Sequence, residues 1–480
     1  MTSYHWCVFS IATLGWLFDG MDQRLFVLAR TPAVRDLVSN LSDAQLTAHA
    51  GYATMIFIFG WATGGLIFGM AGDRIGRVRT MTLTILIYAL FTGLSAFSRT
   101  WWDFALYRFL CGIGIGGEYA AGLALVAEVV PERARPYCLG LLQSLGALGH
   151  ILASWISIHL GPQSEFHGIA GWRILFLLGF LPAILAVVAR LRLREPESWL
   201  TSRAPFREGS NANPKLADAS PERGDLRELF KDRRLRFHLI VGMLLGFAGQ
   251  TGLWGIGYWT PELIRNAQLE LVRENVAAKA DLGGAPDGGR IRTYNLDQLA
   301  AAVKGDQNEA KLQAKQWRAE SDRLVGRGTL LQDVAGMIGI YAFTLLTTRY
   351  GRRLVFAVSF LLAMVATLWT FGRLSQPSDV YWMLPMLGFC SVSMYGGYAI
   401  YFPELFPTRF RSTGIGFCYN VARFVTAFGP LTLGKLAVLY AGMGFAVPLR
   451  QSAMTLSAIF LVGVITIFFA PETKGRPLPD

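Results

Sequence analysis

The 480-residue chain is 52% hydrophobic and only 16% charged, whereas soluble domains carry about 25% charged residues. This composition excludes an ordinary soluble domain. The net charge of +12 would favour nucleic-acid binding in a soluble protein, but here Lys and Arg gather at the ends of apolar segments, so no nucleic-acid partner is expected.

Twelve apolar runs follow one another along the chain, separated by mostly short polar connectors. Each run is close to the roughly 20 residues with which an α-helix crosses a bilayer. The pattern predicts an all-α membrane protein with twelve transmembrane helices. The runs lie at about 4–29, 47–71, 80–98, 102–130, 137–160, 171–190, 237–264, 327–348, 354–372, 380–405, 412–440 and 446–470.

The basic residues predict an orientation. With the N-terminus inside, Lys and Arg are concentrated in the even-numbered connectors and the C-terminal tail, and are scarce in the short odd-numbered connectors. Cytoplasmic loops carry such an excess of positive charge. We therefore expect a multi-pass protein of the inner (cytoplasmic) membrane with both termini in the cytoplasm.

Short motifs recur at a nearly constant offset, which predicts a duplicated six-helix unit. The repeated motifs are E-x-x-P-x-R-x-R from Glu128 and Glu404, R-x-G-R from Arg74 and Arg349, and Pro-Glu at 196–197 and 471–472. The predicted organisation is one six-helix bundle at 1–194, a cytoplasmic linker at 195–235 and a second bundle at 236–480. The two bundles are expected to be pseudo-symmetric.

An insert at 266–327 interrupts the second half outside the membrane, between the seventh and eighth spans. Apolar residues spaced among charges predict one or two surface helices in it: Leu296, Leu299, Val303, Leu312, Trp317 and Leu324. The insert either caps the outer vestibule, contacts an extracytoplasmic partner, or is a tolerated insertion without a function.

The loop after the second span carries a specific resemblance. Gly69, followed by Gly72-Asp73-Arg74-Ile-Gly76-Arg77-Val-Arg79, resembles the G-x-x-x-D-R-x-G-R-[KR] loop of the major facilitator superfamily. The likeness covers essentially the whole chain apart from 266–327. It implies two six-helix bundles around a midplane substrate site.

Three further motifs resemble subfamilies of that superfamily. Asp19-Gly20-Met21-Asp22 is similar to the D-G-x-D of aromatic-acid:proton symporters, and Gly116-Gly117-Glu118-Tyr119 to a span-four motif of organic-acid, sialic-acid and metabolite:proton symporters. The segment 471–476, Pro-Glu-Thr-Lys-Gly-Arg, looks like the closing signature of sugar porters. These motifs indicate two different substrate classes.

Charged residues at the inner ends of the spans are predicted to form a cytoplasmic gate. We expect one set of ion pairs in each half, formed when the cytoplasmic side closes and weakened when it opens. The first set contains Asp73, Arg74, Arg77, Glu128 and Arg135, and the second contains Arg349, Arg352, Glu404 and Arg411. Thr348 takes the place of Asp73 in the second half, so the two sets should differ in strength. Topology-setting arginines without a gating role are the alternative.

Acidic residues inside the spans are candidates for proton coupling, because a charge in mid-membrane is costly unless it is paired or hydrated. Asp19 and Asp22 are three residues apart and share a helical face. Two neighbouring carboxylates in a low dielectric resist ionising together. Glu118 is a second protonation site or a buried hydrogen-bond anchor, with Arg108 as its partner or as a substrate contact.

Arg423, in the middle of the eleventh span, is the candidate anion-binding residue. Its planar guanidinium suits a carboxylate, and a similar Arg precedes a Gly-Pro pair in the aromatic-acid symporters that the chain resembles. A structural pair with Asp333 is the alternative. The other predicted substrate contacts are polar or aromatic: Arg108, Gln143, Gln250, Trp254, Tyr258, Tyr395, Tyr398 and Asn420.

Together these features predict a secondary active transporter that works by alternating access and takes up a small organic anion with protons. The alternatives are a neutral-sugar:proton symporter, a drug or metabolite exporter, and a solute sensor that does not transport. An ATP-driven pump is excluded, because the chain contains no G-x-x-x-x-G-K-[ST] motif. No enzyme activity, cofactor or metal is expected, and the partners are a small solute, protons and the lipid bilayer.

Overall fold

A computed structural model of the chain describes residues 1–38, 43–159, 165–166, 168–201, 226–279, 294, 296–303, 306–445 and 447–479. Residues 202–225 of the predicted linker and 280–293 of the predicted insert lie outside this range.

The first half of the described chain contains nine helices and one minimal hairpin. The helices are α1 (Ser3–Leu37), α2 (Asp43–Ile75), α3 (Arg77–Ser95), α4 (Trp101–Val129), α5 (Arg135–Leu145), α6 (Ala147–His159), α7 (Gly171–Leu178), α8 (Pro182–Arg192) and α9 (Glu197–Thr201). Strands β1 (Glu165–Phe166) and β2 (Ile169–Ala170) pair antiparallel between α6 and α7, with Glu165 opposite Ala170. The prediction of an all-helical membrane bundle holds apart from this hairpin.

The second half repeats the same succession of long helices. Its elements are α11 (Leu226–Lys231), α12 (Arg233–Gln250), η1 (Thr251–Ile256), η2 (Gly257–Trp259), α13 (Thr260–Lys279), α15 (Leu296–Val303), α16 (Gln307–Tyr350), α17 (Arg352–Arg373), η4 (Pro377–Asp379), α18 (Val380–Val392), α19 (Met394–Leu405), η5 (Thr408–Phe410), α20 (Arg411–Thr426), α21 (Gly429–Gly442), α22 (Pro448–Leu456) and α23 (Ile459–Phe469).

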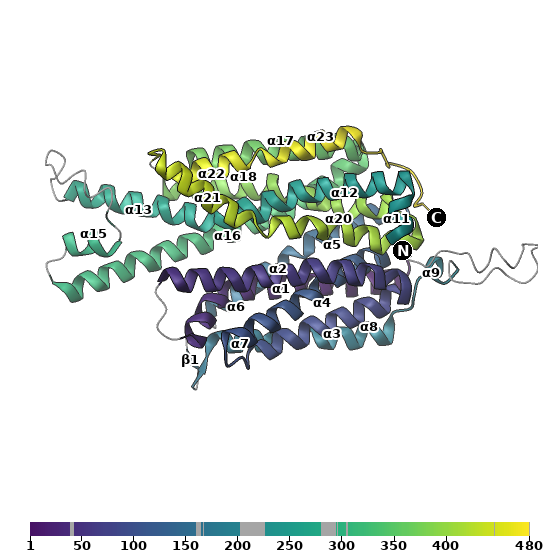
Figure 1. Cartoon of the computed structure of the whole chain (residues 1–480), viewed down its shortest axis with the longest axis horizontal. Helices are drawn as coiled ribbons and strands as arrows, with labels where there is room; N and C mark the ends of the chain where they lie inside the picture. Colours follow the sequence, from purple (N-terminus) through teal and green to yellow (C-terminus); the bar gives the residue numbers. More distant parts are fainter. Residues whose placement is uncertain are drawn as a thin grey trace, which may run out of the picture.

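The two halves lie side by side as two helical bundles (Figure 1), and they touch chiefly where α2 meets α20 and where α5 meets α16 and α19. Both termini lie at one end of the molecule, here called the terminal end, with α9 and α11. The opposite end, here called the insert end, carries α13 and α15. The predicted two-bundle fold is confirmed.

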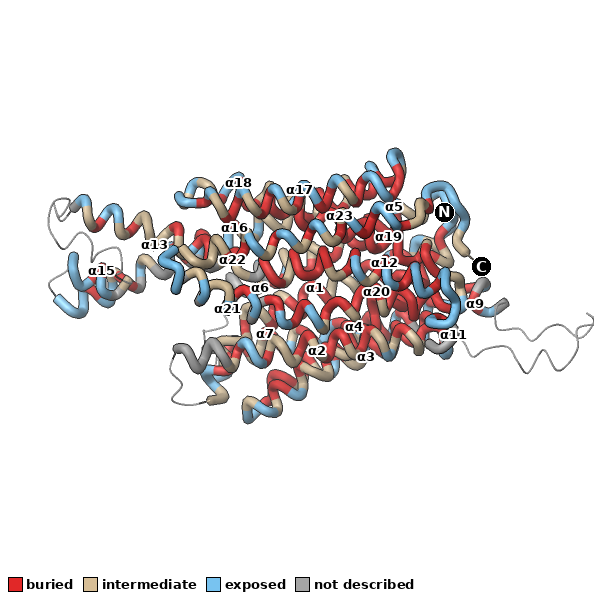
Figure 2. The backbone as a smooth tube through the Cα atoms, turned by 45° about the horizontal axis from the view of Figure 1, so that its top comes forward, coloured by how far each residue is buried: buried red, intermediate tan, exposed pale blue. Residues whose placement is uncertain are grey.

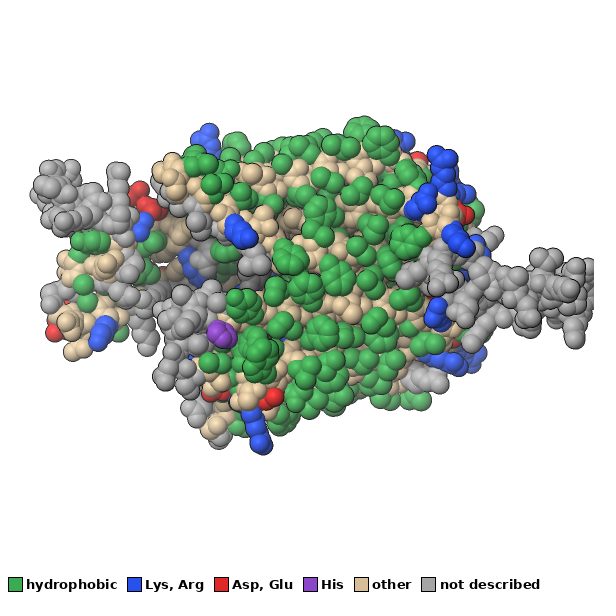
Figure 3. Space-filling model, viewed as in Figure 1, with side chains coloured by type: hydrophobic (Ala, Val, Ile, Leu, Met, Phe, Trp, Pro, Cys, Tyr) green, Lys and Arg blue, Asp and Glu red, His purple; other side chains and the backbone are tan. Residues whose placement is uncertain are grey.

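Within the described residues, ten helical segments are long and apolar enough to cross a membrane. The remaining two predicted spans correspond to α1 and to the consecutive helices α20 and α21. In Figure 3 the side of the molecule is covered by hydrophobic side chains, whereas Lys and Arg appear toward both ends. This distribution matches a bilayer belt between two polar surfaces.

Glycines allow the helices around the centre to approach closely. A methyl group on Gly116 of α4 would collide with the backbone of Trp61 in α2, and one on Gly416 of α20 would meet the backbone at Gly65. The glycine-rich stretch of the fourth span therefore serves helix packing, as small residues do in membrane bundles.

The insert between the spanning helices begins later and ends earlier than the apolar runs indicate, because these helices continue beyond the runs. Helix α13 extends to Lys279 and α16 already begins at Gln307, so much of 266–327 consists of helical extensions. A small core of Val272, Val276 and Leu299, with Trp317 packed against it, joins these extensions to α15. In Figure 2 the buried positions otherwise concentrate within the two bundles.

Candidate functional site

The seventh span changes its helical form at mid-length. After Gln250 the α-helix gives way to one turn of π-helix, Thr251–Ile256, and then to a 3₁₀ turn before α13 continues. Such interruptions often mark functional sites, and broken helices line substrate sites in transporters. The π-helical turn places Trp254 at the interface between the two halves, where the Trp254 and Trp61 rings lie 5.9 Å apart.

Arg423 of α20 is buried between aromatic rings. Its guanidinium carbon lies 3.5 Å from the centroid of the Trp61 ring and 4.4 Å from that of Tyr419. Its Nη1 donates to Asn420 Oδ1 at 2.8 Å, while Nε makes no hydrogen bond within the described structure. No described carboxylate forms an ion pair with it, and Asp333, the alternative partner, pairs with Arg24 instead.

The substrate contacts predicted in the second half differ in their hydrogen-bond partners. The Tyr419 ring lies against the Arg423 guanidinium and stacks on the Tyr119 ring, and Tyr395 donates to Gln250 Oε1 at 3.3 Å. Tyr398 instead donates to the backbone oxygen of Leu245. Its hydroxyl is therefore engaged in helix packing.

Two other predicted contacts are less closely defined. Gln143 of α5 is buried, and its Oε1 has no hydrogen-bond partner in the described structure. The side chain of Tyr258 lies outside the described part of the chain.

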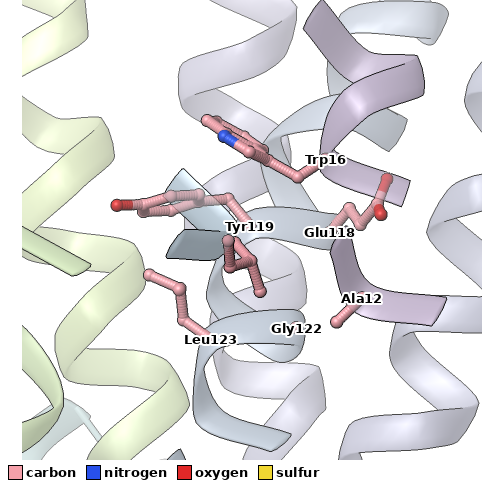
Figure 4. Close-up of a pocket in the computed structure, with 7 residues that line it drawn as sticks. Ala12, Trp16, Glu118, Tyr119, Gly122 and Leu123 are labelled. Carbon is pink, nitrogen blue, oxygen red and sulfur yellow. The ribbon is translucent and has the colours of Figure 1, made fainter. Parts of the chain in front are cut away.

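Asp19 and Glu118 meet in the core of the first bundle. Both are buried, and Glu118 Oε1 approaches α1 at Gly15, one turn from Asp19, whose two oxygens have no hydrogen-bond partner in the described structure. A small pocket beside Glu118 is lined by Ala12, Trp16, Tyr119, Gly122, Leu123 and Leu142, from α1, α4 and α5 (Figure 4).

Asp22 has a different environment from Asp19. It accepts from Thr92 at 2.7 Å and from the Cys111 thiol at 3.3 Å, and it pairs with Arg108 at 3.5 Å. Arg108 therefore neutralises Asp22, and the expected pairing of Arg108 with Glu118 is wrong. The two aspartates of the D-G-x-D motif are separated into one ion-paired carboxylate and one that faces Glu118.

The predicted gate residues of the first half join the two bundles at the terminal end. Asp73 accepts from the backbone N–H groups of Ser412 (3.2 Å) and Thr413 (2.8 Å), so it caps the N-terminus of α20 across the interface. Arg77 pairs with Asp73 at 3.0 Å and with Glu128 at 3.1 Å.

Arg411 was expected to pair within its own half but crosses to the other. Its Nη1 lies 3.0 Å from Glu128 Oε1, so Glu128 holds one arginine from each bundle. Within the second half, Arg352 pairs with Glu404 at 2.7 Å. Arg135 and Arg349 form no ion pair among the described residues.

Beside each of these networks, a glutamate accepts hydrogen bonds from the backbone N–H groups at the start of a helix. Glu195 accepts from the backbone N–H groups of Arg77, Val78 and Arg79 at the start of α3. Glu472 does the same at Arg352 and Arg353, at the start of α17. The structural counterpart of Glu472 is therefore Glu195, one residue before the Pro-Glu pair that the sequence aligned with it.

Comparison with known proteins assigns the fold to a family. Residues 13–277 match the model of the Major Facilitator Superfamily. The chain belongs to this superfamily. It is therefore a multi-pass membrane transporter rather than an enzyme, with the fold of alternating-access secondary carriers.

Individual relatives are similar along almost their whole length. The chain is 28% identical to a cis,cis-muconate transport protein of Acinetobacter baylyi, covering 99% of this chain and 97% of that protein. It is 25% identical to a niacin transporter of the same organism, covering 99% and 96%. A solved proton:xylose symporter has the same fold, with a TM-score of 0.69, 18% identity and coverage of 99% and 98%.

Trp61, Tyr119 and Tyr419 were not predicted as site residues. Trp61 and Tyr419 sandwich Arg423, and the Tyr119 ring stacks on Tyr419 with 4.0 Å between centroids. Tyr419 and Arg423 lie four residues apart on one helix, and this spacing could have predicted their contact. Trp61 belongs to another span, so no spacing in the sequence predicts its contact with Arg423.

Proposed function

We propose that the protein takes up a small organic acid together with protons, and that Arg423 holds the carboxylate of the substrate. The observation that carries this proposal is a buried guanidinium, central in the molecule, with no carboxylate partner among the described residues. A buried charge of this kind needs a counter-ion. Trp61 and Tyr419 restrict the approach to the plane of the guanidinium, where a carboxylate binds with two parallel hydrogen bonds.

The names of the relatives support the same class of substrate. Muconate and niacin are both planar, conjugated carboxylic acids, and their transporters match this chain from end to end. The aromatic walls of the site, Trp61, Trp254 and Tyr419, suit such a flat molecule. A neutral sugar would leave Arg423 without a counter-ion.

Asp19 and Glu118 are the proposed proton carriers. Asp19 interacts electrostatically with Arg423 as well as with Glu118, so protonation of the carboxyl pair and binding of an anion at Arg423 influence each other. A substrate carboxylate beside Arg423 adds negative charge near Asp19, which favours the protonated pair. Proton and anion therefore load together.

We infer that the terminal end faces the cytoplasm and that its ion pairs form the inner gate. The positive-inside distribution of Lys and Arg supports this orientation. Asp73, Glu128 and Arg411 connect the two bundles at this end. Opening toward the cytoplasm requires these contacts to separate, and proton loading and substrate release then occur on opposite sides of the inner membrane.

Uptake into proteoliposomes tests the proposal. Labelled muconate, nicotinate, a sugar acid and xylose are offered with and without an inward proton gradient. We expect gradient-driven uptake of a carboxylic acid. Arg423→Ala should weaken apparent affinity by roughly 30-fold or more, because removing one partner of a buried charge pair costs at least about 2 kcal/mol.

Two comparisons make the test decisive. Arg373→Ala, at the end of α17 beside Trp369, controls for the loss of a positive charge and should leave affinity unchanged. Asp19→Asn should abolish the stimulation by the proton gradient. Xylose uptake that survives Arg423→Ala would instead identify a sugar symporter, and saturable binding without uptake would identify a sensor.

A further inference from the structure

Helix α3 carries a row of buried hydroxyl groups along one face. The members are Thr80, Thr84, Tyr88, Thr92 and Ser95, and the exposed fraction of each is 0%. Spacings of three and four residues place them one above another on the helix. The row runs from the Asp22 region to the terminal end of α3, inside the first bundle rather than between the bundles.

The row meets the acidic cluster through specific bonds at its far end. Thr92 donates to Asp22, and Ser95 accepts from Arg108 Nε at 3.0 Å. One turn closer to the terminal end, the phenol of Tyr88 interacts electrostatically with Glu118, Asp19 and Asp22. Tyr88 is therefore the hydroxyl that follows the carboxyl cluster on the way to the terminal end.

Two hydroxyls of the row and two polar atoms of α1 and α4 have no hydrogen-bond partner in the described structure. They are Tyr88 Oη, Thr80 Oγ1, Thr13 Oγ1 and Glu118 Oε2. A buried polar atom without a hydrogen bond costs free energy, and native proteins satisfy such atoms with ordered water where space allows. Between Tyr88 and Thr80, the Thr84 hydroxyl donates to the Met81 carbonyl at 2.9 Å, so Thr84 offers its oxygen as an acceptor to a bridging water.

Helix α4 packs closely against the row at two glycines. Gly114 lies against the α3 backbone at Thr84 and Tyr88, and Gly117 lies against the Thr84 side chain. These glycines precede Glu118 by four residues and by one, on the helix that packs most extensively on α3 (Figure 1). The side of α4 that carries Glu118 therefore lies directly against the row, in contact with α3 at Thr84 and Tyr88.

We propose that the hydroxyl row of α3 conducts the released proton from the Asp19–Glu118 pair through the first bundle to the terminal end, separately from the substrate. The inference rests on the proposed function. The charged groups at the exit are Arg77, Asp73 and Glu128, which lie at the same end of the helix.

The step balances without any other reactant. Glu118 loses its proton and becomes a carboxylate, while one proton leaves to the aqueous phase beyond Thr80. Tyr88 takes a proton on its oxygen as it gives up its own, so its phenol is neutral before and after. Waters and the threonine hydroxyls relay the proton in the same manner.

The test compares two transport modes in proteoliposomes, using the acid that the wild type accumulates. Accumulation driven by a proton gradient requires proton release in every cycle, whereas exchange between equal internal and external acid does not. Tyr88→Phe and Thr80→Val each remove one hydroxyl from the row at nearly constant volume. We expect gradient-driven accumulation to fall by roughly 100-fold, the lower end of what a positioned proton-transfer group supplies, with exchange unchanged.

Thr82→Val is the matched control. Thr82 is buried on the same helix but off the row, and it donates to the Val78 carbonyl; its loss should leave both modes within about twofold of the wild type. Thr80→Ser keeps a hydroxyl at this position and should, unlike Thr80→Val, accumulate the acid as the wild type does. Equal losses of exchange and accumulation in Tyr88→Phe and Thr80→Val, or no loss in either, would overturn the proposal. A wild type that accumulates acid without moving protons would refute the proposed function itself.

Discussion

Glu472 shows how a single carboxylate stabilises the second bundle. Its oxygens accept from the backbone N–H groups of Arg352, Arg353, Thr473 and Lys474, at 2.9–3.1 Å. Burial alone would raise the pKa of Glu472, but these hydrogen bonds to the ionised form hold it below its usual value. A group whose pKa is depressed by folding stabilises the protein above its unfolded pKa and loses that contribution as pH falls through the folded value.

We therefore predict that Glu472→Gln lowers the thermal unfolding midpoint at neutral pH. The difference from the wild type should close as the pH is lowered below about 4, where the unfolded and then the folded carboxyl become protonated. Unfolding of the purified protein in detergent, followed across the pH range, measures this. Glu132→Gln, at an exposed turn after α4, is the control, and a difference at Glu472 that does not vary with pH would contradict the prediction.

For single residues, the sequence predicted which buried charged side chains matter better than it predicted the residues with which they pair. It singled out Asp19, Asp22, Glu118 and Arg423 because charges in apolar spans are rare and costly. It did not predict that Asp22 pairs with Arg108, because that contact depends on how α1 and α4 pack together. The aromatic contacts of Arg423 with Trp61 depend in the same way on the packing of α20 against α2.

The junctions between α2 and α3 and between α16 and α17 depend on a glycine that no other residue replaces without strain. Gly76 has φ of 117° and Gly351 has φ of 93°, a backbone region that is essentially restricted to glycine. Each glycine is the N-cap of the next helix. In the second half, the Glu472 carboxylate lies against Gly351.

Replacement of Gly351 by Ala should destabilise the protein by about 1–3 kcal/mol, the cost of a strained backbone conformation. The added methyl group would also come 2.9 Å from a Glu472 oxygen. A methyl group added at Gly442 would have no neighbouring atom within 4 Å. Gly442→Ala should therefore be neutral or stabilising by up to about 1 kcal/mol. Thermal unfolding of both variants in detergent tests the contrast, and equal behaviour would show that the positive φ carries no cost.

The elements themselves were largely predictable, with two exceptions. Apolar length alone located the spans, since a bilayer imposes a minimum helix length. The π-helical turn at Thr251–Ile256 was not predicted, because its residues are as apolar as those of a regular helix and only the positions of neighbouring helices select it. The surface helices predicted in the insert are present, as α15 and the first part of α16. The unbroken continuation of the spans into α13 and α16 was not predicted, because beyond the bilayer these helices become amphipathic and charged.

Across the whole molecule, the internal repeat predicted the two bundles but not the contacts that join them. Repeated motifs suggest repeated ion pairs, and Arg352–Glu404 is one of these. Glu128 departs from the repeat, because Arg411 of the other bundle reaches it at 3.0 Å. An interface between two similar halves places equivalent residues face to face, so a motif repeated in sequence can pair across the halves instead of within each.

A second ion pair joins the bundles farther from the terminal end. Arg24 of α1 bonds to Asp333 of α16, and each side chain is 21% exposed. The two helices belong to different halves that move relative to each other during alternating access. Because each charge lies within a spanning helix, either one alone would be left in a poorly hydrated region.

Reversal of this pair tests whether it acts between the halves. Arg24→Asp and Asp333→Arg should each lower uptake by roughly tenfold or more, because a partly buried charge without its partner costs at least about 1.4 kcal/mol. The double exchange should recover most of the activity, since it restores opposite charges across the same interface. The same exchange at Arg173 and Asp36, a pair 3.2 Å apart within the first bundle, should change uptake little in any combination. Failure of the double variant to exceed both single variants would show that Arg24 or Asp333 acts individually, and the pair would then have no role in joining the two bundles.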